Sequence, residues 1–430
     1  MPPAGPAVPP AAGAIAAPAG AWVVLGSRRL VAAALLGFAA GAPLYLTGQL
    51  LVVWMGQSGV ELETASAFAA VGLPYTFKWL WAPLLDRFAL PWLGRRRGWI
   101  VTLEGVIVLA IGGLAAVGVG GDVEVVAALA VTVAAASATH DIVVDAFLAE
   151  SLAPDERAAG AAAYVLGYRA AMLVVGGGGL VLAAYVTWPA VYATAAALVA
   201  VGVIAVALVP EPPATAAPPT LASAIGGSLW DLLARPGAAP VLCAVALYRF
   251  GEQLVLHVQG YFLVSVVGVG VATVGWVTQG AGFAGLAAGG AVLGAVAPRL
   301  GPRRALFVFG GVAAAANLGW ALVAHVGAPL PLFVAVAAVD AFGTALAAGA
   351  FVAFLMSQCA PGRAATQYAL LNALSSVGGR ALGFAIAPLV AYLGWAGFFA
   401  ATAAMIVPAL GTFAMVPRER FAGVASSPPA

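Results

Sequence analysis

The sequence is poor in charged residues: 18 Lys and Arg and 16 Asp and Glu make up only 8% of its 430 residues. A soluble domain carries about a quarter charged residues, so this scarcity excludes a water-soluble globular fold. Hydrophobic residues amount to 63% of the chain, and the mean hydropathy is +1.05. The chain therefore needs a lipid bilayer as its solvent.

Cysteine and histidine are also scarce. Cys243 and Cys359 both fall near predicted cytoplasmic ends of spans, where reducing conditions disfavour a disulfide, so we expect neither a disulfide nor a metal site. A polytopic membrane enzyme such as an acyltransferase or glycosyltransferase needs a nucleophile–base pair or a metal site, and the three scattered histidines provide neither. We predict a protein that is not an enzyme and has no cofactor. The net charge of +2 gives no indication of a nucleic-acid partner.

Long apolar runs are abundant. A bilayer crossing needs about 20 mostly apolar residues, and the sequence holds such segments at 30–55, 64–86, 99–119, 124–150, 157–184, 189–209, 241–266, 272–297, 305–326, 330–357, 363–392 and 395–416. The predicted fold class is an all-α polytopic membrane protein with twelve transmembrane helices.

Basic residues between these segments lie on one side only. With the N-terminus inside, the cytoplasmic segments hold Arg28, Arg29, Arg87, Arg95, Arg96, Arg97, Arg157, Arg235, Arg299, Arg303, Arg304, Arg363, Arg418 and Arg420. The opposite loops contain no Lys or Arg, which follows the positive-inside rule. Both termini are therefore expected in the cytoplasm. Residues 1–27 lack the basic start of a signal peptide and, like 418–430, are expected to form a cytoplasmic tail, disordered in the case of 1–27.

The chain divides into two six-helix halves, 28–209 and 241–417, separated by a cytoplasmic linker at 210–240. Within the linker, LASAIGGSLWDLLAR (221–235) is expected to form an amphipathic helix at the membrane surface. The halves also repeat, because LLDRFALPWLGRRRGW follows span two and AVAPRLGPRRAL follows span eight. Two related six-span halves are typical of transporters, with the substrate path between them near the midplane.

Several charged residues remain inside the spans, where a charge at a helix centre costs about 2.5–3.5 kcal/mol. A rise of about 1.5 Å per residue places Lys78, Asp141, Arg169, Arg249 and Glu252 in one band near the midplane. We expect these residues to line a hydrated passage for a polar substrate and a proton. The alternative is that they form structural ion pairs between helices. A sensor or scaffold would have no need for such a band.

Asp141 and Asp145 are spaced i, i+4 and share one helix face. Two carboxylates so close resist joint ionisation, so we hypothesise that one of them, the deeper Asp141, is the protonation switch. Glu252 is a further candidate for proton coupling. The candidates for substrate binding are the cations Lys78, Arg169 and Arg249, the amides Gln49, Gln279 and Gln367, the aromatic residues Tyr75 and Trp79, and His140.

Other polar residues inside spans favour structural interpretations. Glu104 lies about a turn inside span three and is expected to reach the interface by snorkelling. Asp340 and Arg380 both fall about 25 Å from the cytoplasmic face, so they are expected to pair as an outer gate or brace. His140 points about 100° away from Asp141, so a hydrogen bond to a neighbouring helix is the alternative to substrate contact.

The repeated loop resembles, in degenerate form, the signature loop of the major facilitator superfamily. Longer stretches resemble its AmpG-type muropeptide permeases, which are related to acetyl-CoA transporters. These stretches are PYTFKWLWAPLLDR (74–87), GRRRGW (94–99), HDIVVDA (140–146), DERAAGAAAYVLGYRAAML (155–173), LYRFGEQ (247–253), FVAFLM (351–356), ATQYALLNALSSVG (365–378) and LGWAGFF (393–399). The loop resemblance implies a gating role for Asp86, Arg87, Arg95, Arg96 and Arg299.

The family resemblance implies import of N-acetylglucosaminyl-anhydro-N-acetylmuramic acid, with or without its peptide. Import would be coupled to protons and would cross the bacterial inner membrane by alternating access, in a carrier that we expect to be a monomer. The matching motif residues are Lys78, Asp86, Asp141, Asp145, Arg169, Glu252 and Gln367. His140 stands where the family commonly has Gln, and Arg249 and Glu252 stand where Lys and Asp are frequent. A carrier for another glycan, an acyl-CoA or a drug is the alternative.

Overall fold

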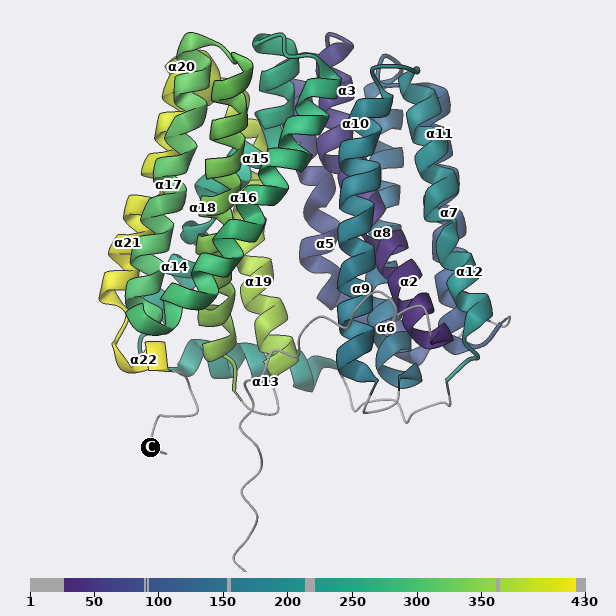
Figure 1. Cartoon of the computed structure of the whole chain (residues 1–430). Helices are drawn as coiled ribbons and strands as arrows, with labels where there is room; N and C mark the ends of the chain where they lie inside the picture. Colours follow the sequence, from purple (N-terminus) through teal and green to yellow (C-terminus); the bar gives the residue numbers. More distant parts are fainter. Residues whose placement is uncertain are drawn as a thin grey trace, which may run out of the picture.

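The computed structural model describes residues 27–88, 90, 93–152, 156–212, 221–360 and 364–422. The expected N-terminal tail and most of the C-terminal tail lie outside the described residues. All regular structure in the described part is helical, and Figure 1 shows the helices standing side by side in two groups. This confirms the predicted all-α class.

The N-terminal half begins with span one, made of α2 (Arg28–Tyr45), the π-turn η1 (Leu46–Leu50) and α3 (Leu51–Gln57). Span two consists of α4 (Leu62–Ala67), η2 (Phe68–Gly72), α5 (Leu73–Phe77), η3 (Lys78–Leu80) and α6 (Ala82–Arg87). Spans three to six are α7 (Arg95–Val117), α8 (Val123–Ser151), α9 (Arg157–Ala171) with η4 (Met172–Gly177) and α10 (Gly178–Leu182), and α11 (Trp188–Val199) with α12 (Val201–Leu208).

The C-terminal half follows the linker helix α13 (Leu221–Ala234). Its spans are α14 (Ala238–Tyr248) with α15 (Phe250–Tyr261) and η5 (Phe262–Val266), then α16 (Val271–Leu300), α17 (Pro302–Val326) and α18 (Leu330–Ser357). The last part contains α19 (Ala364–Ala381), η6 (Gly383–Ala385), α20 (Ile386–Ala404), α21 (Ile406–Met415) and α22 (Glu419–Ala422).

The number of spans follows from the lengths of these helices. In the described part, 10 helical segments are long and apolar enough to cross a membrane, and the last of them covers the 50 residues Thr366–Met415. A straight helix of that length would measure about 75 Å, more than twice the hydrocarbon core of about 30 Å. Gly394 breaks it with φ 67 and ψ 171, so it forms two spans. With the interrupted span at 62–87, the architecture is consistent with twelve.

Span two is interrupted because of its prolines. Pro74 and Pro83 stand in the first turns of α5 and α6, where the missing N–H is tolerated although the preceding helix cannot continue. Short 3₁₀ turns fill the breaks before each proline-started helix. Lys78 is the first residue of one of these turns, η3.

The two halves meet from the middle of the bundle to the end away from α13. We call the end that holds α13 and α22 the basic end and the opposite end the far end (Figure 1). Contacts join α3 to α15, α5 to α19 and α10 to α16. At the far end the Tyr261 hydroxyl donates a hydrogen bond to the carbonyl oxygen of Val60 at 3.0 Å. A Cβ at Gly383 would lie 2.6 Å from the carbonyl oxygen of Ser66, so only glycine permits this approach.

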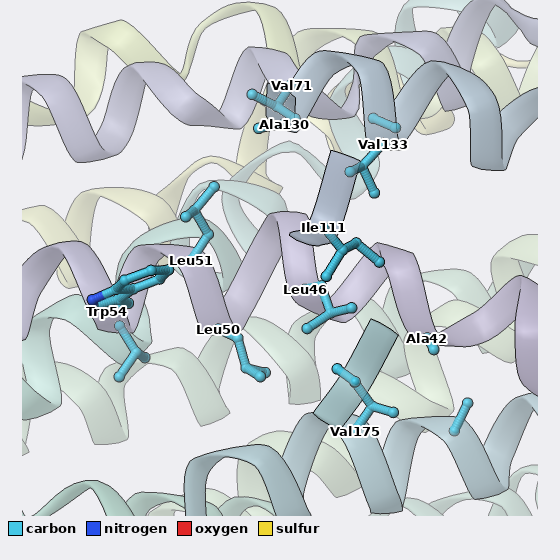
Figure 2. Packing of buried hydrophobic residues seen from close by; sticks show 14 of the residues in the cluster. Ala42, Leu46, Leu50, Leu51, Trp54, Val71, Ile111, Ala130, Val133 and Val175 are labelled. Atoms are coloured by element: carbon cyan, nitrogen blue, oxygen red, sulfur yellow. The ribbon is translucent and has the colours of Figure 1, made fainter. Parts of the chain in front are cut away.

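Buried aliphatic side chains hold the N-terminal half together. Leu46, Leu50, Ile111 and Val175, from η1, α7 and η4, lie together in the core (Figure 2), and each is at most 3% exposed. Lipid tails are as apolar as these side chains, so close packing rather than removal from water stabilises such a contact in a bilayer. This packing fixes the relative positions of the helices that carry the charged residues.

The linker helix α13 confirms the helix predicted at 221–235. Leu232 is 4% exposed against the C-terminal half, whereas Leu229, Trp230 and Leu233 are exposed. A helix that leaves one apolar face exposed at the end of a membrane-spanning bundle is typical of a segment that lies in the membrane interface.

Candidate functional site

An ion pair joins span two to span four inside the N-terminal half. Lys78 Nζ lies 3.1 Å from Asp141 Oδ2, and the two side chains are 32% and 16% exposed. A second contact between the same spans is a hydrogen bond of 3.1 Å from the Trp81 indole to the Thr139 hydroxyl. The break in span two thus places the ammonium group of Lys78 against α8. Two residues that the sequence placed at one depth are in direct contact.

Asp145 lies one turn nearer the basic end on the same helix and is exposed. Its carboxylate has no ion-pair or hydrogen-bond partner among the described residues, although Lys78 and Asp141 are within electrostatic range. Asp141 Oδ1 is buried and likewise accepts no hydrogen bond from a described residue. The two carboxylates therefore differ: Asp141 is in direct contact with a cation, whereas Asp145 contacts none among the described residues.

Arg169 on α9 is an exposed cation with no acidic partner in the described structure. Among the described residues, its guanidinium makes one hydrogen bond, a weak one to the sulfur of Met172 at 3.8 Å. It also lies close enough to Tyr45 and Tyr168 to interact with them electrostatically. A guanidinium left free in this way can bind a carboxylate of a ligand bidentately.

The second ion pair between the charged residues expected near the midplane lies within the C-terminal half. Arg249 donates to Glu252 at 2.8 and 3.1 Å, across the break between α14 and α15, where Arg249 has φ −103 and ψ 5. The predicted band of charges is therefore divided into one ion pair per half. Among the described residues, no hydrogen bond or ion pair joins the two pairs directly.

Glu252 also faces a small cavity inside the C-terminal half, about 30 Å³ in volume. Asn317 and Thr344 line it with Glu252, and Asn317 is 6% exposed. The Asn317 amide makes no hydrogen bond to another described residue. Asn317 could not be predicted as a polar lining residue, because a lone asparagine in an apolar run gives no indication of what it faces.

Arg380 contacts the other half, which corrects the pairing expected with Asp340. Its guanidinium donates to the Thr76 hydroxyl and packs on Gly72, beside a 3.1 Å hydrogen bond between Thr76 and Ser376. Asp340 instead faces α17, within electrostatic range of Glu252. Equal depth along two helices does not set the direction in which their side chains point, and α19 turns Arg380 toward span two.

His140 and Glu104 form a pair that corrects two expectations. His140 Nε2 lies 3.2 Å from Glu104 Oε1, and both residues are 0% exposed. Glu104 therefore does not snorkel, and in this conformation His140 cannot contact a substrate; it takes the alternative role of bonding a neighbouring helix. Gly202 of α12 makes room for the pair, because a Cβ there would lie 1.6 Å from Glu104 Oε1.

The polar and aromatic candidates separate into three locations. Tyr75 and Trp79 lie on span two beside Lys78, and their polar atoms are buried without a partner in the described structure. Gln49 is half-buried in the π-turn η1. Gln279 reaches from α16 into the π-turn η4 of the other half, where a Cβ at Gly177 would lie 2.0 Å from its Cγ. π-Turns are frequent at functional sites, so Gln49 and Gln279 stay candidates.

Gln367 lies elsewhere, which corrects its expected place at the substrate. It is fully buried at the basic end of α19, donates to Asp231 Oδ2 at 2.6 Å and accepts from the backbone N–H of Ala360 at 2.7 Å. Arg235 joins the same cluster. Gln367 thus attaches the linker helix α13 to the C-terminal half.

The first signature loop is held by two acids that sequence analysis missed. Arg95 and Arg96 both donate to the Glu150 carboxylate, with contacts of 2.8–2.9 Å. Glu211 accepts from the backbone N–H groups of Arg96 and Arg97 at 2.7 and 3.0 Å, which caps α7. The side chains of Asp86 and Arg87 lie outside the described part, and Arg299 is exposed in the last turn of α16.

Comparison with known proteins agrees with this architecture. The model of the Major Facilitator Superfamily matches residues 55–379. The anhydromuropeptide permease of Escherichia coli strain K12 is 38% identical over 378 residues, which are 87% of this chain and 77% of the relative. A putative transporter AmpG 4 of Rickettsia felis is 27% identical over 395 residues, covering 89% and 95%.

Among solved structures, the nucleoside transporter NupG superposes with a TM-score of 0.65 at 14% identity, covering 90% of this chain and 98% of that one. A likeness at this identity concerns the fold alone. Both the family model and the 38% identical relative cover most of the chain. The chain therefore belongs to the major facilitator superfamily of membrane transporters, and within it resembles the anhydromuropeptide permeases.

Proposed function

We propose that this transporter imports peptidoglycan-derived anhydromuropeptides, coupled to an inward flow of protons. The carrying observation is the Lys78–Asp141 ion pair, which lies in two stretches, 74–87 and 140–146, that resemble the muropeptide permeases. The name of the 38% identical Escherichia coli relative supports the substrate class. The basic end would face the cytoplasm, in accordance with the positive-inside rule.

The ion pair suggests how a proton and an anionic substrate are coupled. When Asp141 is ionised, it holds the Lys78 ammonium at 3.1 Å. Protonation of Asp141 removes the negative partner, so the Lys78 charge becomes available to a substrate carboxylate. The free guanidinium of Arg169 offers a second anion contact. Protonation of Asp141 then strengthens substrate binding. Because the coupling between two ligands is reciprocal, bound substrate also favours the protonated form of Asp141.

The contacts between the halves support alternating access. They run from the middle to the far end, through α3 and α15, α5 and α19, and α10 and α16. Rocking of the two halves about the central ion pairs would break contacts at one end as it forms them at the other. Arg380 and its Thr76 and Ser376 neighbours would act as a gate on the far side.

Uptake by proteoliposomes tests this function. Purified protein should accumulate labelled N-acetylglucosaminyl-anhydro-N-acetylmuramic acid when the outside is more acidic, and only equilibrate it when the gradient is collapsed. Protein-free liposomes are the control. Gradient-driven transport of an unrelated solute without any uptake of the anhydromuropeptide would favour the alternative of a carrier for another glycan, an acyl-CoA or a drug.

A further inference from the structure

A pocket of about 690 Å³ opens at the basic end of the C-terminal half, away from the central ion pairs. It lies where the start of α17 meets α22, and α22 also packs on α18. Arg303, Arg304 and Arg418 line it together with the aromatic rings of Phe307 and Phe421. Its size is in the range of ligand-binding pockets, about 300–1,000 Å³.

Arg303 and Arg304 have no acidic partner among the described residues, whereas their counterparts in the other half, Arg95 and Arg96, have one. In the first half, Glu150 binds Arg95 and Arg96. In the repeated loop, by contrast, the one hydrogen bond of the Arg303 side chain among the described residues goes to the Ala414 carbonyl oxygen at 3.3 Å. The Arg303 guanidinium also lies 5.8 Å from the ring centres of Phe307 and Phe421.

Arg304 and Arg418 are exposed, and their side chains make no hydrogen bond or ion pair with a described residue. The nearest acid along the chain, Glu419, is exposed and pairs with neither. The pocket therefore presents three positive charges with which no acidic side chain of the described residues forms an ion pair. The first turn of α17 adds partial positive charge from its free N–H groups.

Below the arginines the pocket lining is apolar, which suits a ligand with both a charged group and hydrocarbon chains better than it suits a small anion. Phe307 and Val308 follow the arginines along α17, and Val308 is 48% exposed. At about 1.5 Å per residue, Val308 lies roughly 9 Å deeper than Pro302. Positive charge at the rim and exposed apolar surface below it match a phosphate headgroup with acyl chains beneath.

From this arrangement we infer that the pocket binds an anionic phospholipid, with its phosphodiester between Arg304 and Arg418 and its chains along Phe307 and Val308. Basic pockets between helices at the cytoplasmic face are suited to acidic headgroups. The bound lipid supplies at this loop the negative charge that Glu150 supplies at the other. This assignment depends only on the chain being embedded in a membrane, so it is independent of the transported substrate.

Binding of fluorescent phosphatidylglycerol to the delipidated full-length protein in detergent measures this site. We expect the Arg304→Gln/Arg418→Gln variant to bind at least about tenfold more weakly, because each basic residue near an anionic lipid contributes measurably to affinity. The matched variant Arg28→Gln/Arg97→Gln removes two charges at the same end of the other half and should bind as the wild type does. Melting curves without lipid confirm that both variants are folded.

Two further arms identify the ligand. Phosphatidylcholine, which has the same chains without net charge, should bind much more weakly, and millimolar inorganic phosphate should displace little phosphatidylglycerol. Equal loss of binding in both double variants would overturn the proposal, because it would indicate general surface charge. Equal binding of phosphatidylcholine, or full displacement by phosphate, would overturn it as well.

Discussion

Replacing Asp141 by Asn is expected to abolish accumulation of substrate against its gradient, while exchange of substrate across the membrane continues. Asn keeps the size of the side chain and removes its charge and its proton. Lys78 then stays available to the substrate at every pH, so binding persists but no longer depends on a proton. Proteoliposome uptake with an acidic exterior, compared with counterflow at equal pH, measures both properties.

Asp145→Asn is the matched control, because Asp145 is on the same helix face but has no cation in contact. We expect this variant to keep gradient-driven accumulation. If Asp141→Asn accumulated substrate normally at wild-type protein levels, the switch would not be Asp141. Loss of accumulation in Asp145→Asn alone would transfer the role to Asp145.

Replacing His140 by Leu is expected to lower the free energy of unfolding by about 3–5 kcal/mol, the cost of removing one partner of a buried pair. Glu104 is fully buried and its Oε1 is held by His140 at 3.2 Å. Without the imidazole the carboxyl group is left unpaired between α7, α8 and α12. Melting of the purified protein in detergent measures this loss.

The double variant Glu104→Leu/His140→Leu separates pairing from packing. It removes both polar groups at similar volume and should recover most of the lost stability, because an apolar pair can replace a buried polar pair. The single variant Glu104→Leu completes the comparison. If the double variant lost as much free energy of unfolding as Glu104→Leu and His140→Leu lose together, the two residues would act independently and the assignment as a pair would be wrong.

The fold could be predicted closely from the sequence because hydropathy and turn chemistry report on each span separately. The segment expected at 330–357 is α18, Leu330–Ser357, and that expected at 305–326 begins three residues earlier in α17. The linker helix was found by the same reasoning. Span two was also predicted, at 64–86. Its prolines divide it into short helices, none of which is long enough to cross a membrane alone.

For the candidate site, the sequence predicts how deep each charged residue lies along its helix, but not the direction in which its side chain points. Counting residues along a helix placed Lys78 and Asp141 at one level, and they meet. The same counting paired Arg380 with Asp340, which the structure separates, because the side-chain directions depend on how each helix is rotated against its neighbours. Only the packing of α19 on span two decides that Arg380 bonds Thr76.

Partners far apart in sequence were the hardest to foresee. Glu211 caps α7 from the linker, and nothing in its Pro-rich surroundings indicates this. The burial of Glu104 depends on the missing Cβ of Gly202, a single glycine among many. The signal that could have indicated this pair is a glycine in one predicted span at the same depth as a polar residue in a neighbouring span, as Gly202 is to Glu104.

The protonation of Asp141 can be observed directly by infrared difference spectroscopy of the wild-type transporter as substrate is added. The ion-pair switch predicts that substrate produces the carbonyl band of a protonated carboxyl group, that Asp141→Asn eliminates this band, and that Asp145→Asn and Glu252→Gln retain it. A band of full intensity in Asp141→Asn would contradict the proposed coupling of the Lys78–Asp141 pair to the substrate.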